Sequence, residues 1–540
     1  MPRILQDQIQ SDQKFSKDFW VALGSILFIA ALVRFWNINA RSLWFDEAFE
    51  FWVSNNRLEH IWQATLSAKQ PPFFNFLLHF WMKIGSSEVW LRTLSVLFSL
   101  GGISGIFFST HYVFGTRAAV IAGLIMSFLP GDVRYAQEVA EYAPLICFSS
   151  WMVYFHLRNL ECADGKFWIV SLLFWLLGIY THYGAAIIIL SLSLINFIYN
   201  LNHKQNKNIL KQVVFSLLFL LLAAPLITIV PSQIQSQNLT PAIITDLKNE
   251  VILFFQSVST TFAFPILGHP WTNIPIIWSK LLVLLGILLI ITVCFTGSKK
   301  QKVVSGFFLC SYLIYFVLVR LGFYGYGSFG FRYMVVLLPL FSTAFAGAVD
   351  VVLKNKLKAS LIGYMVVIFL LGLSLYSLPN RWISEKTRGL TTWPETEDMQ
   401  PLVDYLATKS DLNLPIYVNH TALPAFAYYV GLESQYSSIG TLPKNWINSC
   451  WSGEKLDFCT YNNYYFGVWN RSFTGQNKAD SILQTFENPP TQFWLVLSHH
   501  FNGDQDSIEA LQKYASYSVI EQRIWQGAKL LLLSLNPEDY

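Results

Sequence analysis

The sequence predicts a polytopic α-helical membrane protein with a C-terminal extracytoplasmic α/β domain. Of the 540 residues, 53% are hydrophobic and only 13% are charged, about half of the charged fraction of roughly 25% in soluble domains. Apolar runs of bilayer-spanning length recur along residues 1–378, and the net charge changes sign just after them. Residues 1–380 carry 26 basic and 16 acidic side chains, whereas residues 381–540 carry 11 and 17. This composition excludes a cytosolic globular enzyme.

Eleven apolar runs are long enough to predict membrane spans. They cover residues 19–36, 89–110, 117–131, 142–157, 167–180, 184–200, 212–230, 276–296, 303–321, 333–352 and 359–378. The run at 117–131 is short, and the stretch at 253–266 is too polar for a full span. The first span follows a polar start of about eighteen residues without a small-residue cleavage site, which argues against a cleaved signal peptide.

Basic residues predict the orientation of these spans, because Lys and Arg near span ends resist translocation. With a cytoplasmic N-terminus, every predicted inner loop contains basic residues. They are Arg3, Lys14, Lys17, Arg117, Arg158, Lys166, Lys204, Lys207, Lys211, Lys299, Lys300, Lys302, Lys354, Lys356 and Lys358. An odd number of spans then places the chain after Pro379 outside, in a periplasm or an equivalent lumen.

Residues 379–540 predict a separate soluble domain outside the membrane part, which comprises residues 1–378. Its apolar runs at 415–420, 493–500 and 529–535 alternate with helix-like stretches at 396–409 and 505–516, a pattern typical of an α/β sandwich-like domain. Its only cysteines, Cys450 and Cys459, form a disulfide or remain two unpaired thiols, and the sequence leaves both open.

The first outer loop, about residues 37–87, contains the most conspicuous polar residues. The stretches RSLWFDEAFEFW (41–52) and AKQPPFFNFLLHFWMK (68–83) predict amphipathic helices at the membrane interface. Asp46 and Glu47 are adjacent and therefore point about 100° apart on a helix, so at most one of them acts directly on a ligand. The alternative is a structural role, with Asp46 as an N-cap and Glu47 in the first turn.

Three further outer loops carry charged or hydroxyl-bearing residues. Residues 131–142 (GDVRYAQEVAEY) place Arg134, Glu138 and Glu141 on neighbouring turns of one predicted helix, where Arg134 and Glu138 can also form a simple i,i+4 pair. The other two loops contain Thr181-His182-Tyr183 and Phe331-Arg332-Tyr333. A single residue of this kind is often an interfacial anchor, but their recurrence at one membrane depth in four loops favours a shared site.

These motifs together resemble a known family. RSLWFDEA, KQPPFFNFLLHFW, YAQEVAEYA, YTHYG and FRYMVVLLPL, in this order over about residues 19–352, are similar to the polyprenyl-phosphate-dependent membrane glycosyltransferases of the GT-C superfamily. Within it they resemble the branch of protein O-mannosyltransferases and lipid A aminoarabinose transferases (glycosyltransferase family 39-like). The resemblance implies the GT-C fold, with about eleven transmembrane helices. The chain lacks the β-trefoil insert of the eukaryotic protein mannosyltransferases, which favours a bacterial inner-membrane enzyme.

The resemblance also implies roles for the outer-loop residues. Asp46 corresponds to the general base, and Glu47 orders the loop or the acceptor. Lys69 corresponds to a basic residue near the donor phosphate, although Gln70 stands where many relatives have His before the Pro pair. The implied phosphate ligands are Lys69, Arg332 and Tyr333, and the implied substrate-binding residues are Asp132, Arg134, Glu138, Glu141, Tyr142, His182 and Tyr183.

The implied reaction moves a sugar from a polyprenyl phosphate to a hydroxyl of a lipid, glycan or protein acceptor on the periplasmic face, with inversion at the anomeric carbon. A phosphate leaves without a proton donor, so one carboxylate base and one cation suffice. Paired carboxylates can hold a divalent cation near a phosphate, but the sequence requires none. Nothing in it indicates a nucleic acid partner, the identity of the sugar or the identity of the acceptor.

Two other classes remain as alternatives. A lipid-linked sugar flippase or transporter also carries charged residues in its spans, but usually near the midplane and in repeated halves. A structural envelope protein whose outer domain binds partners leaves the acids of the first loop unexplained.

Overall fold

The structure, a computed structural model, describes most of the chain. The described residues are 15–161, 165–202, 206–235, 276–321, 330–354, 397–409, 414–430, 460–461, 464–467, 473–486, 488–498 and 503–536, with four single residues between 368 and 375. By its contacts the chain divides into two compact units. Unit 1 comprises Met1–Trp36, Ser95–Gln137 and Glu141–Arg381, and unit 2 comprises Asn37–Leu94, Glu138–Ala140 and Trp382–Tyr540.

Unit 1 consists of helices that follow the predicted spans. They are α2 (Lys17–Phe35), α6 (Glu88–Phe114, which begins in unit 2), α7 (Thr116–Phe128), α8 (Pro130–Ala136), α9 (Tyr142–Glu161), α10 (Gly165–Thr181), α11 (Ala185–Asn202), α12 (Asn206–Ile227), α13 (Val230–Gln235), α15 (Ile276–Thr296), α16 (Lys299–Arg320), the 3-10 helix η1 (Gly330–Leu337) and α17 (Leu338–Lys354). A helix therefore covers each of the first ten predicted spans. Within the described residues, six helices are long and apolar enough to cross a membrane, or up to seven if α7 and α8, bent by 62°, form one span.

The remaining predicted apolar segments are not tested. The stretch at 253–266 and nearly all of the predicted span at 359–378 lie outside the described residues. The multi-pass architecture is confirmed, while the count of eleven spans stays a prediction.

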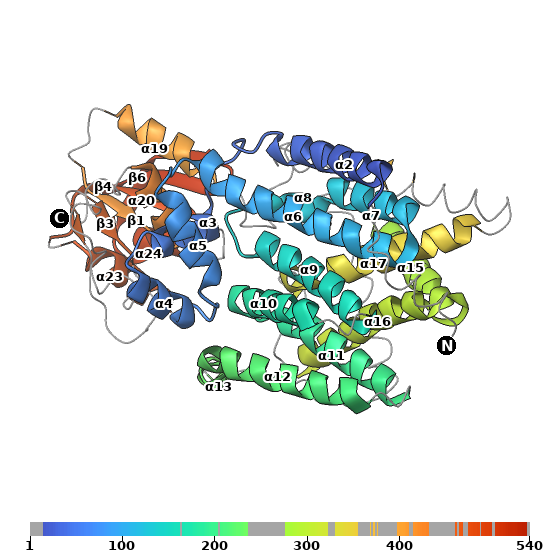
Figure 1. The fold of residues 1–540 in the computed structure, drawn as a ribbon. Coiled ribbons are helices and arrows are strands. Elements are labelled where there is room, and N and C mark those ends of the chain that lie inside the picture. The colour runs from blue at the N-terminus through green and yellow to red at the C-terminus, as the bar shows by residue number, and fades with distance from the viewer. Residues whose placement is uncertain are drawn as a thin grey trace, which may run out of the picture. The chain divides into compact units, whose positions relative to one another are not determined.

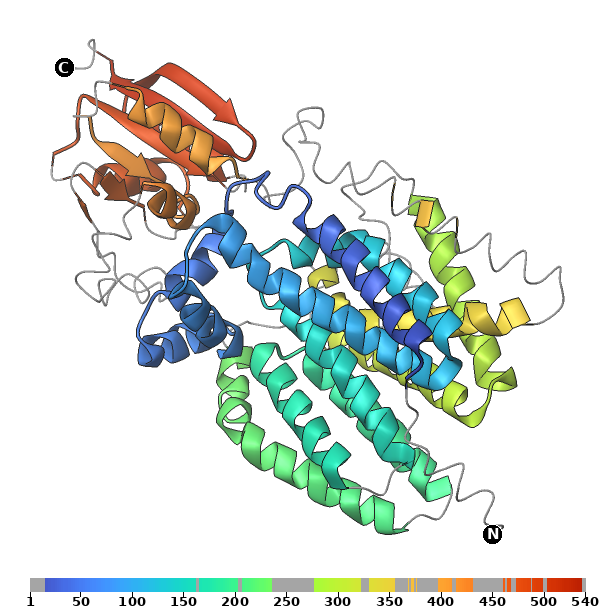
Figure 2. The same ribbon diagram turned by 45° about the horizontal axis from the view of Figure 1, so that its top comes forward.

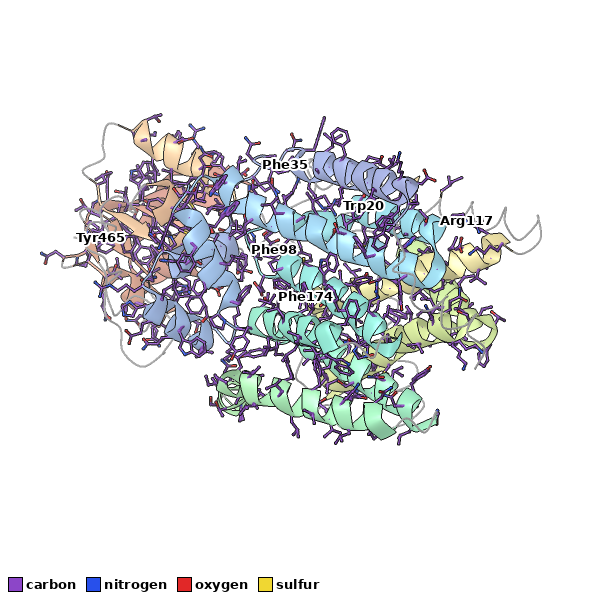
Figure 3. The ribbon with its side chains drawn as sticks, viewed as in Figure 1. Trp20, Phe35, Phe98, Arg117, Phe174 and Tyr465 are labelled. Carbon is purple, nitrogen blue, oxygen red and sulfur yellow. The ribbon has the colours of Figure 1, made fainter. Side chains whose placement is uncertain are left out.

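The helices of unit 1 differ in how much of their surface is buried. Helices α9, α10, α11 and α12 pack side by side (Figures 1 and 2), and α12 exposes Leu217 and Leu221, 60% and 69% accessible, as a lipid-facing helix does. Helix α17 is almost entirely buried, because α7, α9, α15 and α16 all pack against it. The rings of Phe98 and Phe174, labelled in Figure 3, both contact Phe148, with centroids 5.5 and 6.3 Å away.

Basic residues from several predicted inner loops gather at one end of unit 1. Arg117 at the start of α7 (Figure 3) lies 2.5 Å from Asp350, and Lys354 lies 2.7 Å from the same carboxylate. Lys300 lies over the ring of Tyr112, in the last turn of α6, at 4.3 Å. The ends of α6 and α17 and the starts of α7 and α16 are therefore on one side, as the charge pattern predicts.

Unit 2 contains one six-stranded mixed sheet in the order β2-β3-β1-β4-β6-β5. Its strands are β1 (Ile416–Val418), β2 (Thr460–Tyr461), β3 (Tyr464–Phe466), β4 (Gln492–Ser498), β5 (Tyr517–Trp525) and β6 (Ala528–Leu535), with helices α19 (Met399–Ala407), α20 (Leu423–Tyr429), α23 (Gln476–Leu483) and α24 (Gly503–Tyr514). Strands β3, β1 and β4 are parallel, whereas β6 pairs antiparallel with β4 and β5. All three predicted apolar runs form strands and both predicted helices form.

The α/β character predicted for this region is confirmed, and its described strands form a single mixed sheet. The central strand β4 is buried from Phe493 to Ser498, which means that both of its faces are covered. Phe493, Leu495 and Leu497 pack with Leu531 and Leu533 of β6 in the core. Cys450 and Cys459, and the predicted domain boundary at 378/379, lie outside the described residues.

The first outer loop belongs to the same unit as the sheet. It forms three short helices, α3 (Phe45–Ser54), α4 (Leu58–Ser67) and α5 (Phe73–Met82), of which α3 and α5 are the two predicted interfacial helices. Helix α20 packs on α3 (Figure 1). Trp52 donates its indole N–H to the Pro424 carbonyl at 2.9 Å, and the ring of Phe51 meets that of Tyr428 edge-on at 5.0 Å.

Candidate active site

Asp46 and Glu47 lie in the first turn of α3 in different surroundings. The N-cap is Trp44, so Asp46 is the second residue of the helix and Glu47 the third. The alternative that Asp46 is the N-cap is therefore wrong. Glu47 accepts a hydrogen bond from the Trp44 N–H at 3.4 Å and is 1% exposed, whereas Asp46 is half-buried.

The carboxylate of Glu47 is held by Arg92 of α6. Nε of Arg92 donates to Oε1 at 2.8 Å and Nη2 donates to Oε2 at 2.7 Å. The backbone N–H of Val139 donates to Oε1 at 3.1 Å. The remaining donors of Arg92 reach the carbonyls of Ile38, Arg41 and Ser42 at 2.9, 2.9 and 3.2 Å. A paired, fully hydrogen-bonded carboxylate of this kind fixes the entry into α3.

Sequence reasoning missed Arg92. Its signal was present, because an arginine inside an apolar run requires a buried partner or a path to the interface. The partner, Glu47, lies 45 residues earlier in the chain, and no local pattern indicates that pairing.

A second polar cluster lies on the face of α3 that carries Asp46. Glu50 is one turn beyond Asp46, so both carboxylates point to the same side of the helix. Asn75 of α5 donates to Glu50 Oε2 at 2.5 Å and to Ser54 Oγ at 3.2 Å, and His79 Nδ1 donates to the Ser54 carbonyl at 2.8 Å. These contacts join α5 to the helix that carries Asp46.

Lys69 occupies an unusual backbone conformation. Helix α4 ends in a Schellman motif, with the Lys69 N–H bonded to the Leu66 carbonyl at 3.1 Å and the Gln70 N–H bonded to the Thr65 carbonyl at 2.9 Å. Lys69 is the residue after the C-cap Ala68 and has φ of 62°, a conformation that glycine adopts at no steric cost. The backbone of Lys69 is therefore strained, and strained non-glycine residues often occur at functional sites.

In unit 1, Asp132 pairs with Arg34, which the sequence reading also missed. The guanidinium of Arg34 contacts the carboxylate of Asp132, and Ser99 Oγ bridges the two, at 2.8 Å from Arg34 Nε and 3.0 Å from Asp132 Oδ2. Arg34 also donates to the carbonyls of Met126 and Ser127 at 3.0 and 3.2 Å. These carbonyls are in the last turn of α7, so Arg34 satisfies the backbone groups exposed by the bend between α7 and α8.

The prediction that Arg134, Glu138 and Glu141 share one helix is wrong. Helix α8 ends at Ala136, and the chain turns before α9 begins at Tyr142. The helix cannot continue, because the Val139 N–H bonds to Glu47 instead of an upstream carbonyl. All three side chains are at most 5% exposed, so none lies on an open helix surface. Glu138 clusters with unit 2, and the other two belong to unit 1.

The rings of Tyr142 and His182 come together in unit 1. Their rings are 6.1 Å apart, and the ring of Tyr135 lies 4.6 Å from that of Tyr142. His182 Nδ1 accepts the Gly184 N–H at 2.8 Å, which leaves the ring proton on Nε2. Burial lowers the pKa of His182 to about 4, so the imidazole is neutral at pH 7. Tyr183 follows in the same turn and is half-buried.

Arg332 and Tyr333 lie in η1, which packs against α9 and α11, the helices flanking the Tyr142–His182 contact. Their side chains are outside the part of the chain that the structure describes. Across the described ranges, no group of three or more His, Cys, Asp or Glu side chains is arranged to hold a metal ion.

Comparisons with known proteins agree with this architecture. Residues 69–229 match the family model described as dolichyl-phosphate-mannose-protein mannosyltransferase. The fold is similar to that of ArnT from Cupriavidus metallidurans in the apo state, with a TM-score of 0.54 and 13% identity over 95% of this chain and 97% of that one. The same protein bound to undecaprenyl phosphate gives a TM-score of 0.52 and 13% identity over 96% and 98%. No curated protein matches the sequence.

At such low identity the solved structures show the fold alone. The chain has the ArnT-like GT-C fold, with a helical membrane part and a small C-terminal sheet domain. The family match and this fold confirm the resemblance to the GT-C superfamily.

Proposed function

We propose that this protein, whose fold is of the GT-C type, is a membrane glycosyltransferase that takes its sugar from a polyprenyl phosphate. The observation that carries the proposal is the contrast between the adjacent carboxylates at the start of α3. Glu47 is 1% exposed and binds Arg92, Trp44 and Val139, whereas Asp46 is half-buried, and therefore more accessible, on a helix held from several sides. Such an arrangement presents one rigid carboxylate, as a general base requires.

The proposed chemistry needs few groups. A carboxylate oxygen of Asp46 takes the proton of an acceptor hydroxyl while the hydroxyl oxygen attacks the anomeric carbon. The bond from that carbon to the phosphate oxygen breaks, and the lipid phosphate leaves with the electron pair. Attack opposite to the leaving group inverts the anomeric configuration. The phosphate needs no proton to leave, but its developing charge requires cations.

Lys69, Arg332 and Tyr333 are the proposed phosphate ligands. Lys69 precedes the Pro71-Pro72 turn and begins the segment that matches the mannosyltransferase family model. The similar ArnT structure holds undecaprenyl phosphate, a ligand of the class we propose for the donor. Tyr142, His182 and Tyr183 are proposed to contact the sugar or the lipid.

The buried acids and Arg134 are proposed to act around this site. Asp132 and Arg134 lie in α8, Glu138 and Glu141 lie in the turn between α8 and α9, and all four are proposed to bind substrate. The domain after residue 378, the first outer loop and the reaction are assigned to the periplasmic face of a bacterial inner membrane, with the N-terminus in the cytoplasm, as the distribution of basic residues predicts.

The Asp46→Asn variant tests the proposal. Purified protein in proteoliposomes is given radiolabelled undecaprenyl-phosphate-linked sugars and a cell-envelope extract as acceptor. Loss of a general base lowers the transfer rate by about 10² to 10⁴, and Asp480→Asn, at an exposed position of α23, serves as the control. Transfer by Asp46→Asn at the normal rate would remove Asp46 from the mechanism.

A flippase is the second candidate, and the buried Arg34–Asp132 pair beside the bend between α7 and α8 favours it. Charged pairs at broken helices are common in transporters. Passage of a lipid-linked sugar across proteoliposomes without covalent transfer would identify this activity.

A further inference from the structure

Helix α20 of the C-terminal region ends in a tyrosine that enters the hydrogen-bond network of the first outer loop. The phenol oxygen of Tyr429 accepts the backbone N–H of Leu43 at 2.6 Å and donates to Glu88 Oε1 at 2.5 Å. Leu43 is fully buried and lies two residues before α3 begins. The phenol therefore satisfies a buried backbone donor that an apolar ring would leave unpaired.

The hydrogen-bond network continues from Glu88 to the first turn of α3. Glu88 Oε2 lies 3.6 Å from Arg92 Nη1, and Arg92 grips Glu47 through two hydrogen bonds. The chain of contacts thus runs from Tyr429 through Glu88 and Arg92 to Glu47, the neighbour of Asp46. Every member is in unit 2.

Both Arg92 and Tyr429 hold the segment that leads into α3. Arg92 binds three of its carbonyls, at Ile38, Arg41 and Ser42, and Tyr429 binds the next N–H, at Leu43. A second contact from the C-terminal region joins the Gln400 N–H to Ser42 Oγ at 3.2 Å. These bonds leave the backbone before Asp46 little freedom to move.

Burial and the adjacent carboxylate of Glu88 raise the pKa of Tyr429. The phenol therefore stays protonated at neutral pH and keeps donating to Glu88.

We infer that the C-terminal domain is part of the catalytic apparatus, and that Tyr429 is a positioning residue that fixes Asp46 through Leu43, Glu88 and Arg92. This inference rests on the proposed function. It assigns the domain a role in the chemical step itself.

The neighbouring residue provides a matched control. Tyr428 is on the same helix, donates its hydroxyl to the Ser86 carbonyl at 2.8 Å and packs on Phe51. Tyr429→Phe and Tyr428→Phe delete the same atom, so a general loss of docking affects both variants alike.

The experiment uses the full chain in proteoliposomes, with radiolabelled undecaprenyl-phosphate-linked sugars and an envelope extract. For Tyr429→Phe we expect kcat to fall about 10- to 100-fold, because small displacements of a catalytic group cost rates of this order. The KM for the lipid donor should stay within about twofold, because the hydrogen bonds of Tyr429 go to Leu43 and Glu88, which are not among the proposed phosphate ligands. Tyr428→Phe should keep kcat within about threefold, an effect of the size of one neutral hydrogen bond.

Hydrogen exchange of residues 43–54 is the second measurement, and it does not depend on turnover. Faster exchange in Tyr429→Phe than in Tyr428→Phe supports the inference. Equal kcat and equal exchange in the two variants overturn it. If the unaltered protein transfers no sugar, the proposed function fails, while the exchange comparison still decides whether Tyr429 holds this segment.

Discussion

Arg92 binds Glu47, the second acid of the Asp-Glu motif, through two parallel hydrogen bonds. The bonds measure 2.8 and 2.7 Å, and both side chains are at most 2% exposed. A bidentate geometry of this kind depends on the planar guanidinium, which lysine does not provide. These contacts hold the Glu47 side chain in place at the start of α3.

Removal of Arg92 should destabilise the protein strongly. Arg92→Ala leaves the Glu47 carboxylate buried without its charge partner and frees three backbone carbonyls, which costs about 3–5 kcal/mol. Thermal unfolding in detergent measures the loss. Arg57→Ala, at the exposed N-cap of α4, should stay within about 0.5 kcal/mol of the parent, and an Arg92→Ala protein as stable as Arg57→Ala would show that the pair contributes little.

The conformation of Lys69 predicts opposite effects on stability and activity. Lys69→Gly relieves a left-handed backbone conformation that costs an L-residue about 1–2 kcal/mol, so the unfolding temperature should rise. The KM for an undecaprenyl-phosphate-linked sugar should rise as well, because the variant loses a cation near the proposed phosphate.

Lys83→Ala provides the control for charge alone, since Lys83 lies at the end of α5 and contacts the Phe80 ring at 4.8 Å. A Lys69→Gly protein with an unchanged KM would remove Lys69 from the phosphate site.

His182 predicts a loss of stability in acid. Burial lowers its pKa to about 4 in the folded protein, compared with about 6.5 in the unfolded chain. Between these values the unfolded state binds more protons, so stability is fully present above about pH 6.5 and declines as the pH falls toward 4. This group contributes at most about 1.4 kcal/mol per pH unit.

His182→Asn should flatten that decline. The asparagine oxygen can accept the Gly184 N–H in the way that side chains do in an Asx turn, and it does not titrate. Unfolding temperatures at pH 7, 6, 5 and 4 measure the effect, and an equally steep decline in the variant would place the source at another group.

Local patterns in the sequence predict the elements well. A helix appears at each of the first ten predicted spans, and the apolar runs at 415–420, 493–500 and 529–535 all become strands, because hydropathy and alternation act over a few neighbouring residues. The sequence does not predict strands β2 and β3, which are only two and three residues long. Their pairing with neighbouring strands, rather than their own composition, makes them strands.

The pairings between distant residues could not be predicted from the same patterns. The resemblance implies that Asp132 binds substrate, which stays a prediction, but no local pattern indicates its pairing with Arg34, 98 residues away. The predicted helix through Arg134, Glu138 and Glu141 does not form, and the Val139 N–H within that stretch bonds to Glu47, 92 residues away. In both cases the contact joins residues that are far apart in the sequence.

The Arg34–Asp132 pair has a consequence for the order in which the protein enters the membrane. Arg34 lies in the last turn of α2; an arginine at the centre of a membrane helix costs about 2.5–3.5 kcal/mol at the translocon, and less near the helix end. At about 5–20 residues per second, its partner leaves the ribosome roughly 5–20 seconds later. During this interval the side chain must extend toward the lipid headgroups. We therefore expect the first helix to adopt its final depth only after α7 and α8 have been inserted.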